Sequence, residues 1–296
     1  MNMASSLPDT ELSSEVSDNG MEMDANKSWR AHLHLKFSGR DDKTVISHRQ
    51  HHGPLVIQKP FYPEADVCHV YLLHPPGGVV GGDQLTLDIE VNREGHALVT
   101  TPAAGKFYRS ASSIARLKQT LTVEAESTLE WLPQETILFS GCEVEMSTIV
   151  QLEEGASFIG WEILCLGRPA GNELFETGSA RQCFEIWRNN KPLLLDRARL
   201  AGNADVLSAQ WGMQNYTVTG TMMAVNVTKQ MLDHVRENMP EMKQGLISVT
   251  LINDVLVCRA LSHQAEYIRF AFIDVWRKLR IDLLGRDACE PRIWST

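Results

Sequence analysis

The sequence predicts a mainly β fold, in which layers of strands stack as in a β-helix or solenoid, with two α-helices in the C-terminal third. Three observations lead to this prediction. Apolar and polar residues alternate in several segments between residues 84 and 200, which is the period of half-buried strands. Turn sequences recur about 30 residues apart in the same region. Beyond it, the apolar spacing changes to that of amphipathic helices.

Four strand–turn–strand units make up the repeated region. Their turns lie at residues 92–95, 124–127, 153–155 and 189–192. In the first unit, apolar residues alternate from Leu85 to Val91, and a second apolar run follows the turn. A hairpin-like unit of this size cannot bury its apolar face alone, so we expect the units to stack on one another. An ordinary β-sandwich with regular hairpins is the alternative.

The first helix of the C-terminal third is predicted to begin after Thr228, whose side chain can cap it, and to run to about Met239. Pro240 cannot continue a helix and therefore stops it. A strand-like run follows at residues 246–259.

A second, longer helix is predicted between Ser262, as its N-cap, and Gly285. Its apolar residues cover more than one stripe, so we expect it either to be sandwiched in the core or to be half covered by another subunit. The basic residues near its end are expected to be exposed. The side chains expected to form a partner surface are Phe270, Ile273, Trp276, Arg277 and Arg280.

The net charge of −9 is unevenly distributed. Residues 1–26 contain no Lys or Arg and are rich in Ser, Asp, Asn and Glu. This composition predicts a disordered acidic N-terminal extension over residues 1–27, followed by a single β-rich domain over residues 28–296. The extension has neither the basic start nor the apolar centre of a signal peptide, and its acidity argues against a transit peptide. Its acidic residues are Asp9, Glu11, Glu15, Asp18, Glu22 and Asp24.

Composition excludes several classes of protein. No apolar run approaches the roughly 18 residues of a membrane span. No basic patch is interleaved with aromatic residues, which argues against nucleic acid as a partner. The six cysteines are scattered without C-x-x-C pairs. We therefore expect reduced, largely buried thiols in a cytoplasmic protein.

The most unusual segment is residues 74–83, HPPGGVVGGD. Its prolines fix φ and remove backbone donors, whereas its glycine pairs permit left-handed conformations. Such a loop can bring the backbone close to a phosphate, another strand, an ion or a partner. Neither a P-loop nor a dinucleotide fingerprint fits, because Thr100 stands where the first P-loop glycine should be and a strand-like segment follows the loop. A sharp turn between strands is the alternative.

Four segments place charged residues beside glycine, proline and aromatic residues: 74–83, 101–110, 130–135 and 160–173. Three of them follow the return arms of consecutive units, so stacking would bring them to one edge. Their charges could then form one seam, or each could pair off in a separate structural salt bridge. The residues concerned are Asp83, Glu135, Glu162 and Glu173, with Lys106, Arg109 and Arg168.

Familiar catalytic arrangements are absent from the sequence. It contains no G-x-S-x-G elbow and no H-E-x-x-H pair. His32 with His34, or His51 with His52, could bind a metal loosely, but neither pair has an obvious third ligand. A β-helical carbohydrate-active enzyme that uses loop carboxylates stays open as an alternative function.

Taken together, four motifs resemble urease accessory protein D, called H in some bacteria. They are the loop at residues 74–83, the segment KFYRS at 106–110, WLPQE at 131–135 and GRP at 167–169. The resemblance covers roughly residues 28–286. The acidic extension departs from the family pattern, as does Asn172 in place of a small residue.

The resemblance implies a non-enzymatic urease maturation factor with a mainly β, stacked fold. Members of the family bind apo-urease and recruit accessory protein F, which docks the nickel-carrying GTPase, accessory protein G. The complex delivers Ni²⁺ to the buried urease site, and an internal passage through this protein is the suggested route. We expect part of the helix at residues 262–284 to dock accessory protein F.

The chemistry of nickel suggests which residues serve such a route. Thiolates and imidazoles would hold Ni²⁺ tightly, whereas carboxylates, carbonyls and water bind weakly enough for release. For the same reason, the sparse thiols and imidazoles argue against a nickel store. We hypothesise that Asp83, Glu135 and Glu173 are acidic stepping points, with Asp83 and Glu135 as transient nickel ligands and no tightly bound cofactor. Glu162 is a further candidate carboxylate, and the loops would be held in shape by Gly81, Gly82, Lys106, Arg109 and Arg168.

Overall fold

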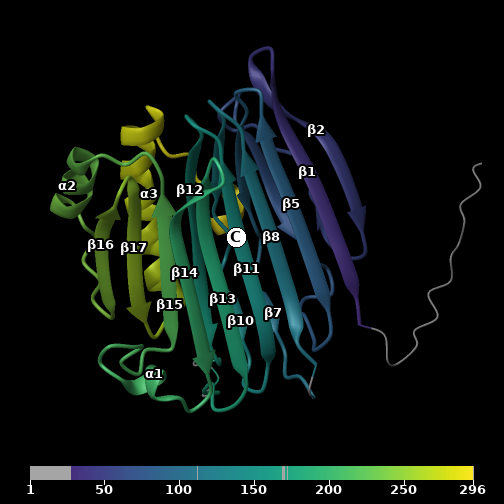
Figure 1. The fold of residues 1–296 in the computed structure, drawn as a ribbon, viewed down its shortest axis with the longest axis vertical. Coiled ribbons are helices and arrows are strands. Elements are labelled where there is room, and N and C mark those ends of the chain that lie inside the picture. The colour runs from purple at the N-terminus through teal and green to yellow at the C-terminus, as the bar shows by residue number, and fades with distance from the viewer. Residues whose placement is uncertain (1–27, 112, 169–170, 172, 296) are drawn as a thin grey trace, which may run out of the picture.

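Two β-sheets lie face to face in the computed structural model, with the longest helix against the outer side of one of them (Figure 1). The structure describes residues 28–111, 113–168, 171 and 173–295. The predicted acidic extension at residues 1–27 lies outside the described residues, as does Asn172.

The first sheet has seven strands, of which the five central ones are parallel and the two outermost are antiparallel to their neighbours. Buried and partly exposed residues alternate along the central strands, because one face packs on the core. In spatial order the strands are β14 (Lys191–Ala201), β13 (Ser179–Arg188), β11 (Glu143–Leu152), β8 (Ala115–Val123), β5 (Gln84–Asn92), β1 (Arg30–Arg40) and β2 (Lys43–His52).

The second sheet also has a parallel centre, formed by β4, β6, β9 and β12. Its main path is β16 (Leu246–Ile252), β17 (Val255–Ser262), β15 (Val218–Ala224), β12 (Ser157–Leu166), β9 (Thr128–Trp131), β6 (His96–Thr100), β4 (Cys68–Leu73) and β3 (Val56–Ile57). Two short strands, β7 (Gly105–Phe107) and β10 (Thr136–Leu138), continue from it beside β12.

The chain alternates between these sheets, so that β5, β6 and β7 form one coil and β8, β9 and β10 form the next. The result is a β-solenoid of about four turns, as predicted. The units are not hairpins, however, except for the fourth. The turns at residues 92–95, 124–127 and 153–155 carry the chain from one sheet to the other, and only the turn between β13 and β14 closes an antiparallel pair.

Backbone hydrogen bonds continue through the corners that join the sheets. Glu124 N donates to Val91 O at 2.9 Å, and Glu153 N donates to Val123 O at 3.0 Å. Gly155 has a φ of +80°, and a Cβ there would collide with the Glu126 side chain of the coil beneath. Each corner therefore sets the register of the next coil, and a slip of one residue would turn the apolar side chains outward.

Three α-helices complete the described part of the chain: α1 (Asp205–Ser208), α2 (Lys229–Glu237) and α3 (Ala265–Leu284). A short 3₁₀ helix follows at Arg292–Ser295. The two longer α-helices are the predicted ones, and α1 was not predicted because a single turn leaves no periodic pattern.

The predicted helix caps are partly right. The Thr228 hydroxyl accepts a hydrogen bond from Met231 N, as expected of the cap of α2. Gly285 ends α3 with a φ of 62°. The prediction of Ser262 as the N-cap of α3 is wrong. Ser262 is the last residue of β17, its hydroxyl donates to Gln244 O at 2.7 Å, and Gln264 takes the cap position.

Helix α3 packs into the core against the second sheet. A Cβ at Gly220 would lie 2.6 Å from Ile268 and 2.8 Å from Phe272, so the glycine lets the helix approach the sheet closely. Ile273 and Trp276 are buried in the same interface. One side of the helix is therefore buried against the sheet, and the other side faces solvent.

Arg280, expected to be exposed, is instead fully buried. Its guanidinium lies 2.7 Å from a Glu64 oxygen and 3.1 Å from a Glu130 oxygen. His96 and His69 contact the same two carboxylates, at 2.7 and 2.8 Å. Burial raises the pKa of Glu64, but hydrogen bonds from His69 and Arg280 outweigh it and lower that pKa to about 2. The helix carries this charge opposite two carboxylates, Glu130 on β9 and Glu64 in the turn before β4.

Replacing Arg280 with Ala should lower the free energy of unfolding by about 3–5 kcal/mol, since it removes the buried cation from the fully buried Glu130 and the partly buried Glu64. Arg277→Ala is the matched control, because Arg277 lies on the exposed side of the same helix and pairs there with Glu290. It should cost about 1 kcal/mol or less. Chemical denaturation of both variants measures the difference, and equal small losses would show that the buried cluster does not hold α3.

Candidate functional site: a cavity under the stacked motif loops

The four motifs singled out in the sequence lie side by side, in and around the short strands β7 and β10. Val79 N donates to Lys106 O at 2.8 Å, and Tyr108 N donates to Val79 O at 2.9 Å. Next to them β7 pairs with β10, and β10 pairs with β12. Gly167 N then donates to Leu138 O at 2.8 Å. The prediction that stacking gathers these segments at one edge is confirmed.

Asp83 closes the loop at residues 74–83. Its carboxylate is buried and accepts hydrogen bonds from Trp29 N at 2.8 Å and from Val80 N at 3.0 Å. Gly81 packs against Ser110 and Ser113, where a Cβ would collide, and Gly82 has a φ of +94°. This carboxylate therefore fixes the loop and the start of β1 together.

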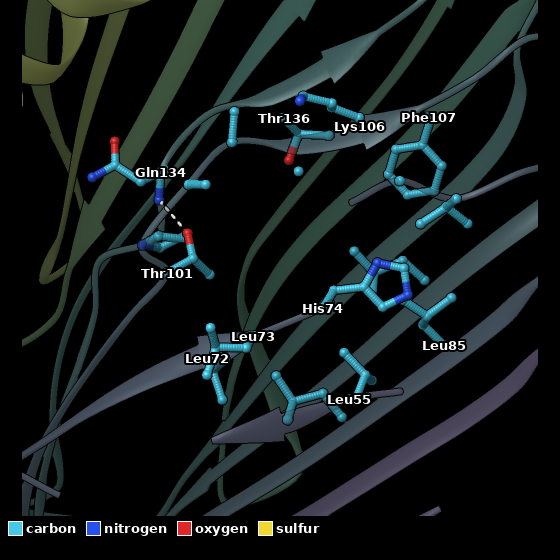
Figure 2. Close-up of a pocket in the computed structure, with 18 of the residues that line it drawn as sticks. Leu55, Leu72, Leu73, His74, Leu85, Thr101, Lys106, Phe107, Gln134 and Thr136 are labelled. Carbon is cyan, nitrogen blue, oxygen red and sulfur yellow. Dashed lines mark hydrogen bonds between the residues drawn. The ribbon is translucent and has the colours of Figure 1, made fainter. Parts of the chain in front are cut away.

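A cavity of about 310 Å³ lies between the two sheets beneath these loops (Figure 2). Its wall is mainly apolar, with Leu55, Leu72 and Leu85 on one side of the view and the segment from Thr101 to Phe107 above. A few polar groups interrupt the apolar lining, which is typical of a binding site. They are His74, Thr101, Lys106, Gln119, Gln134, Thr136 and Glu162.

Glu162 is the candidate carboxylate that lines this cavity. The carboxyl contacts the Thr148 hydroxyl and the Gln182 amide, which come from two other strands. Thr148 also lies 2.7 Å from the Gln119 carbonyl oxygen. The hydroxyl has a single proton to donate to these two oxygens. Competition for this one proton weakens the hydrogen bond from Thr148 to Glu162, which favours the protonated carboxyl group.

Burial acts in the same direction. It raises the pKa of Glu162 and outweighs the hydrogen bonds from Thr148 and Gln182, while the nearby charge of Asp196 raises that pKa further. The interior of the solenoid thus holds, in contact with a cavity, an acid whose burial favours the protonated form. Burial also lowers the pKa of His74 in the cavity wall, although Asp83 opposes that shift.

The other predicted carboxylates have partners of their own. Glu135 lies 3.4 Å from Arg269 of α3, and Glu173 lies 2.8 Å from Arg168 with both side chains about half exposed. Neither Glu135, Glu173 nor Asp83 is part of the cavity wall as the structure describes it. The charged seam is therefore not continuous, and the alternative of separate ion pairs describes Glu135 and Glu173.

Of the cations expected to shape the loops, Lys106 lines the cavity and Arg109 packs its side chain against Gly141. Thr148, Gln119 and Gln182 were not predicted as site residues. Gln119 lies between Leu117 and Leu121, at an inward position of an alternating strand. A polar residue in this apolar series was the feature of the sequence that could have indicated a site residue.

Within residues 28–295, as far as they are described, no group of three or more His, Cys, Asp or Glu side chains is placed to hold a metal ion. His32 and His34 each pair with a carboxylate of β5 instead. Burial raises the pKa of the Cys142 and Cys258 thiols to about 12. No helix in the described part of the chain is long and apolar enough to cross a membrane.

Comparison with known proteins identifies the group to which this architecture belongs. The family model for the UreD urease accessory protein matches residues 30–295. The chain belongs to the UreD family. Its UreD relatives in Alcanivorax borkumensis and Citrobacter koseri are 44% and 41% identical, over 92% and 91% of this chain and 94% and 93% of theirs. A UreD of Pseudomonas putida strain W619 is 42% identical over 90% of this chain and 95% of its own.

UreD proteins are accessory proteins rather than enzymes. Family membership thus confirms the resemblance in the motifs and replaces the alternative of a carbohydrate-active enzyme. Because UreD proteins are not enzymes, a catalytic role does not explain why Glu162 is placed inside the fold.

Glu162→Gln should change the pH dependence of stability. The folded protein binds the Glu162 proton more tightly than the unfolded chain, so the free energy of unfolding falls as the pH rises above the ordinary value of 4.5. Glutamine does not ionise and avoids this fall. Denaturation at about pH 4 and about pH 8 should therefore show the variant gaining stability relative to wild type at the higher pH. An equal difference at both values would mean that Glu162 is not held neutral.

Proposed function

We propose that the chain is a cytoplasmic, non-enzymatic urease maturation factor that binds apo-urease, recruits accessory proteins F and G, and helps deliver Ni²⁺ to the urease active site. Membership of the UreD family supports the urease role. The observation that carries the delivery step is the cavity beneath the motif loops, with the acid Glu162 in its wall.

The donor set of the cavity suits passage rather than storage. Glu162 and the amide and hydroxyl oxygens around it are hard ligands that hold Ni²⁺ less tightly than thiolates do. A cation that reached Glu162 would displace its proton, and the proton would return when the cation left. The net charge of the interior then rises by one unit when the ion arrives, rather than by two. Such a site attracts the ion without trapping it.

Asp83 and Glu135 are proposed as further transient oxygen ligands near the loops, and Glu173 as an acidic position at the surface. Asp83 would have to release Trp29 N or Val80 N to bind a cation, and Glu135 would have to release Arg269. Glu162 is therefore the first carboxylate to test.

Filling the cavity should block delivery. Ala104 lies in the cavity wall, so Ala104→Trp places an indole in the space proposed for the ion. When the variant replaces wild type in cells that express the urease operon, we expect the nickel content and activity of urease to fall severalfold. Co-purification with urease and the accessory proteins should persist, because Ala104 is a cavity-wall residue that is only partly exposed.

Ala125→Trp is the matched control, because Ala125 is exposed at a corner turn outside the cavity. It should leave nickel content unchanged. Cells without the chain give the lower limit. Normal urease nickel in the Ala104→Trp cells would contradict the internal route, whereas normal nickel in cells without the chain would contradict the maturation role itself.

For accessory protein F, we propose the solvent-facing stripe of α3, defined here by Phe270, Arg277 and Ile281. Phe270 is 56% exposed and Ile281 is 50% exposed, and the Arg277 side chain is about half exposed. These positions are seven and four residues apart, so they lie on one side of the helix. An apolar pair flanking a cation is the composition that interfaces favour. Ile273, Trp276 and Arg280 support this stripe from inside.

Phe270→Asp and Arg277→Glu should each weaken binding of accessory protein F by about 1–2 kcal/mol, which is roughly tenfold in affinity. Both side chains are exposed, so stability should change little. Trp211 lies in the loop after α1 and is the most exposed tryptophan among the described residues. Trp211→Asp is therefore the control and should not affect binding. Pull-down against purified accessory protein F measures the effect. Unchanged binding in both α3 variants would remove this stripe from the interface.

A further inference from the structure

The outer face of the seven-stranded sheet carries a cluster of cations on a chain whose net charge is −9. Strand register places Arg116, Glu145, Arg181 and Arg199 in one row across four strands. The adjacent row contains Lys118 and Arg197. These residues line a surface hollow of about 680 Å³. We call this surface the basic face; its cations are Arg116, Lys118, Arg181, Arg197 and Arg199.

The carboxylates of the basic face do not balance its cations. Glu145 is shared by Arg116 at 2.9 Å and Arg181 at 3.3 Å. Arg197 pairs with Glu185 at 2.6 Å. Lys118 and Arg199 have no ion-pair partner among the residues that the structure describes. The face therefore presents excess positive charge to an anionic ligand.

The start of the described chain lies at the edge of this face. Trp29 N is held by Asp83, and Trp29 O accepts from Gln84 N at 2.9 Å. Arg30 pairs with Gln84, which pairs in turn with Arg116, so the chain enters the sheet in the same row as the basic face. The residues that precede this point are the acidic ones: Asp9, Glu11, Glu15, Asp18, Glu22 and Asp24.

The acidic segment is long enough to cover the face. Neighbouring strands are about 4.8 Å apart, so the five steps from β1 to β14 span about 24 Å. An extended segment of 26 residues reaches up to about 85 Å. Because it is tethered at the edge of the face, its effective concentration there is far above that of a separate acidic protein.

We propose that the acidic segment at residues 1–26 docks on the basic face of its own chain. The contact consists of exposed ion pairs, so it is weak and sensitive to salt. While docked, the segment covers the arginines that an acidic surface of another protein would need. Any such protein has to displace it, and the segment thereby restricts this face to strongly acidic partners.

Zero-length carbodiimide crosslinking of the purified full-length chain tests the proposal, because the reagent joins a lysine amine to a carboxylate only when they touch. Lys118 is the lysine of the basic face, and trypsin releases residues 1–27 as one peptide because Lys27 is the first basic residue. Mass spectrometry should find Lys118 joined to this peptide. The yield should fall severalfold in about 0.5 M NaCl, where screening lengths are only a few Å.

Charge reversal separates the basic face from a general electrostatic effect. Arg181→Glu with Arg199→Glu should lower the yield severalfold, whereas Lys229→Glu with Lys243→Glu makes the same change in net charge elsewhere and should not. A mixture of isotope-labelled and unlabelled chains shows whether the link is intramolecular. Absence of the Lys118 link, a yield that ignores salt and charge reversal, or a link found only between chains would overturn the proposal.

Discussion

In-register stacking of parallel coils is the constraint on which the rest of the structure depends. The corners carry it, because Glu124 and Glu153 continue the ladder from one coil to the next where the chain changes sheets. A strand that slipped by one residue would turn Leu87 and Ile89 out of the core. The same register aligns Gly105, Thr136 and Leu164, and so brings the motif loops together over the cavity. The register of the stacked coils therefore determines both the core and the candidate site.

Strand β9 couples helix α3 to the cavity within that stack. On β9, Glu130 points toward α3 and binds Arg280, whereas the next residue, Trp131, points inward and lines the cavity. Alternation along the strand thus joins the helix anchor to the cavity wall. A solenoid sheet would otherwise expose its outer face, and the buried ion pairs fix where the helix covers it. The other side of α3, with Phe270 and Ile281, faces solvent.

Local pattern was enough to predict the solenoid and the two longer helices. The alternation from Leu85 to Val91 and the evenly spaced turns each report on a few neighbouring residues, and those preferences agree with the fold. The errors arise where distant residues decide. Ser262 has the right chemistry for a cap but is used by β17, and Arg280 follows the exposed pattern of a helix end but meets Glu64 and Glu130 from far along the chain. The site was predicted as a set of loops, whereas the raised pKa of Glu162 comes from its burial between the stacked coils, where Thr148 and Gln182 contact it.

In the proposed function, one carboxyl group inside the fold, that of Glu162, links this architecture to metal delivery. Nickel-edge anomalous diffraction from crystals of the full-length chain soaked in a nickel salt examines that link. An anomalous peak is expected inside the cavity, within coordinating distance of the Glu162 carboxyl group. Peaks confined to the outer surface, with the cavity free of nickel, would contradict it.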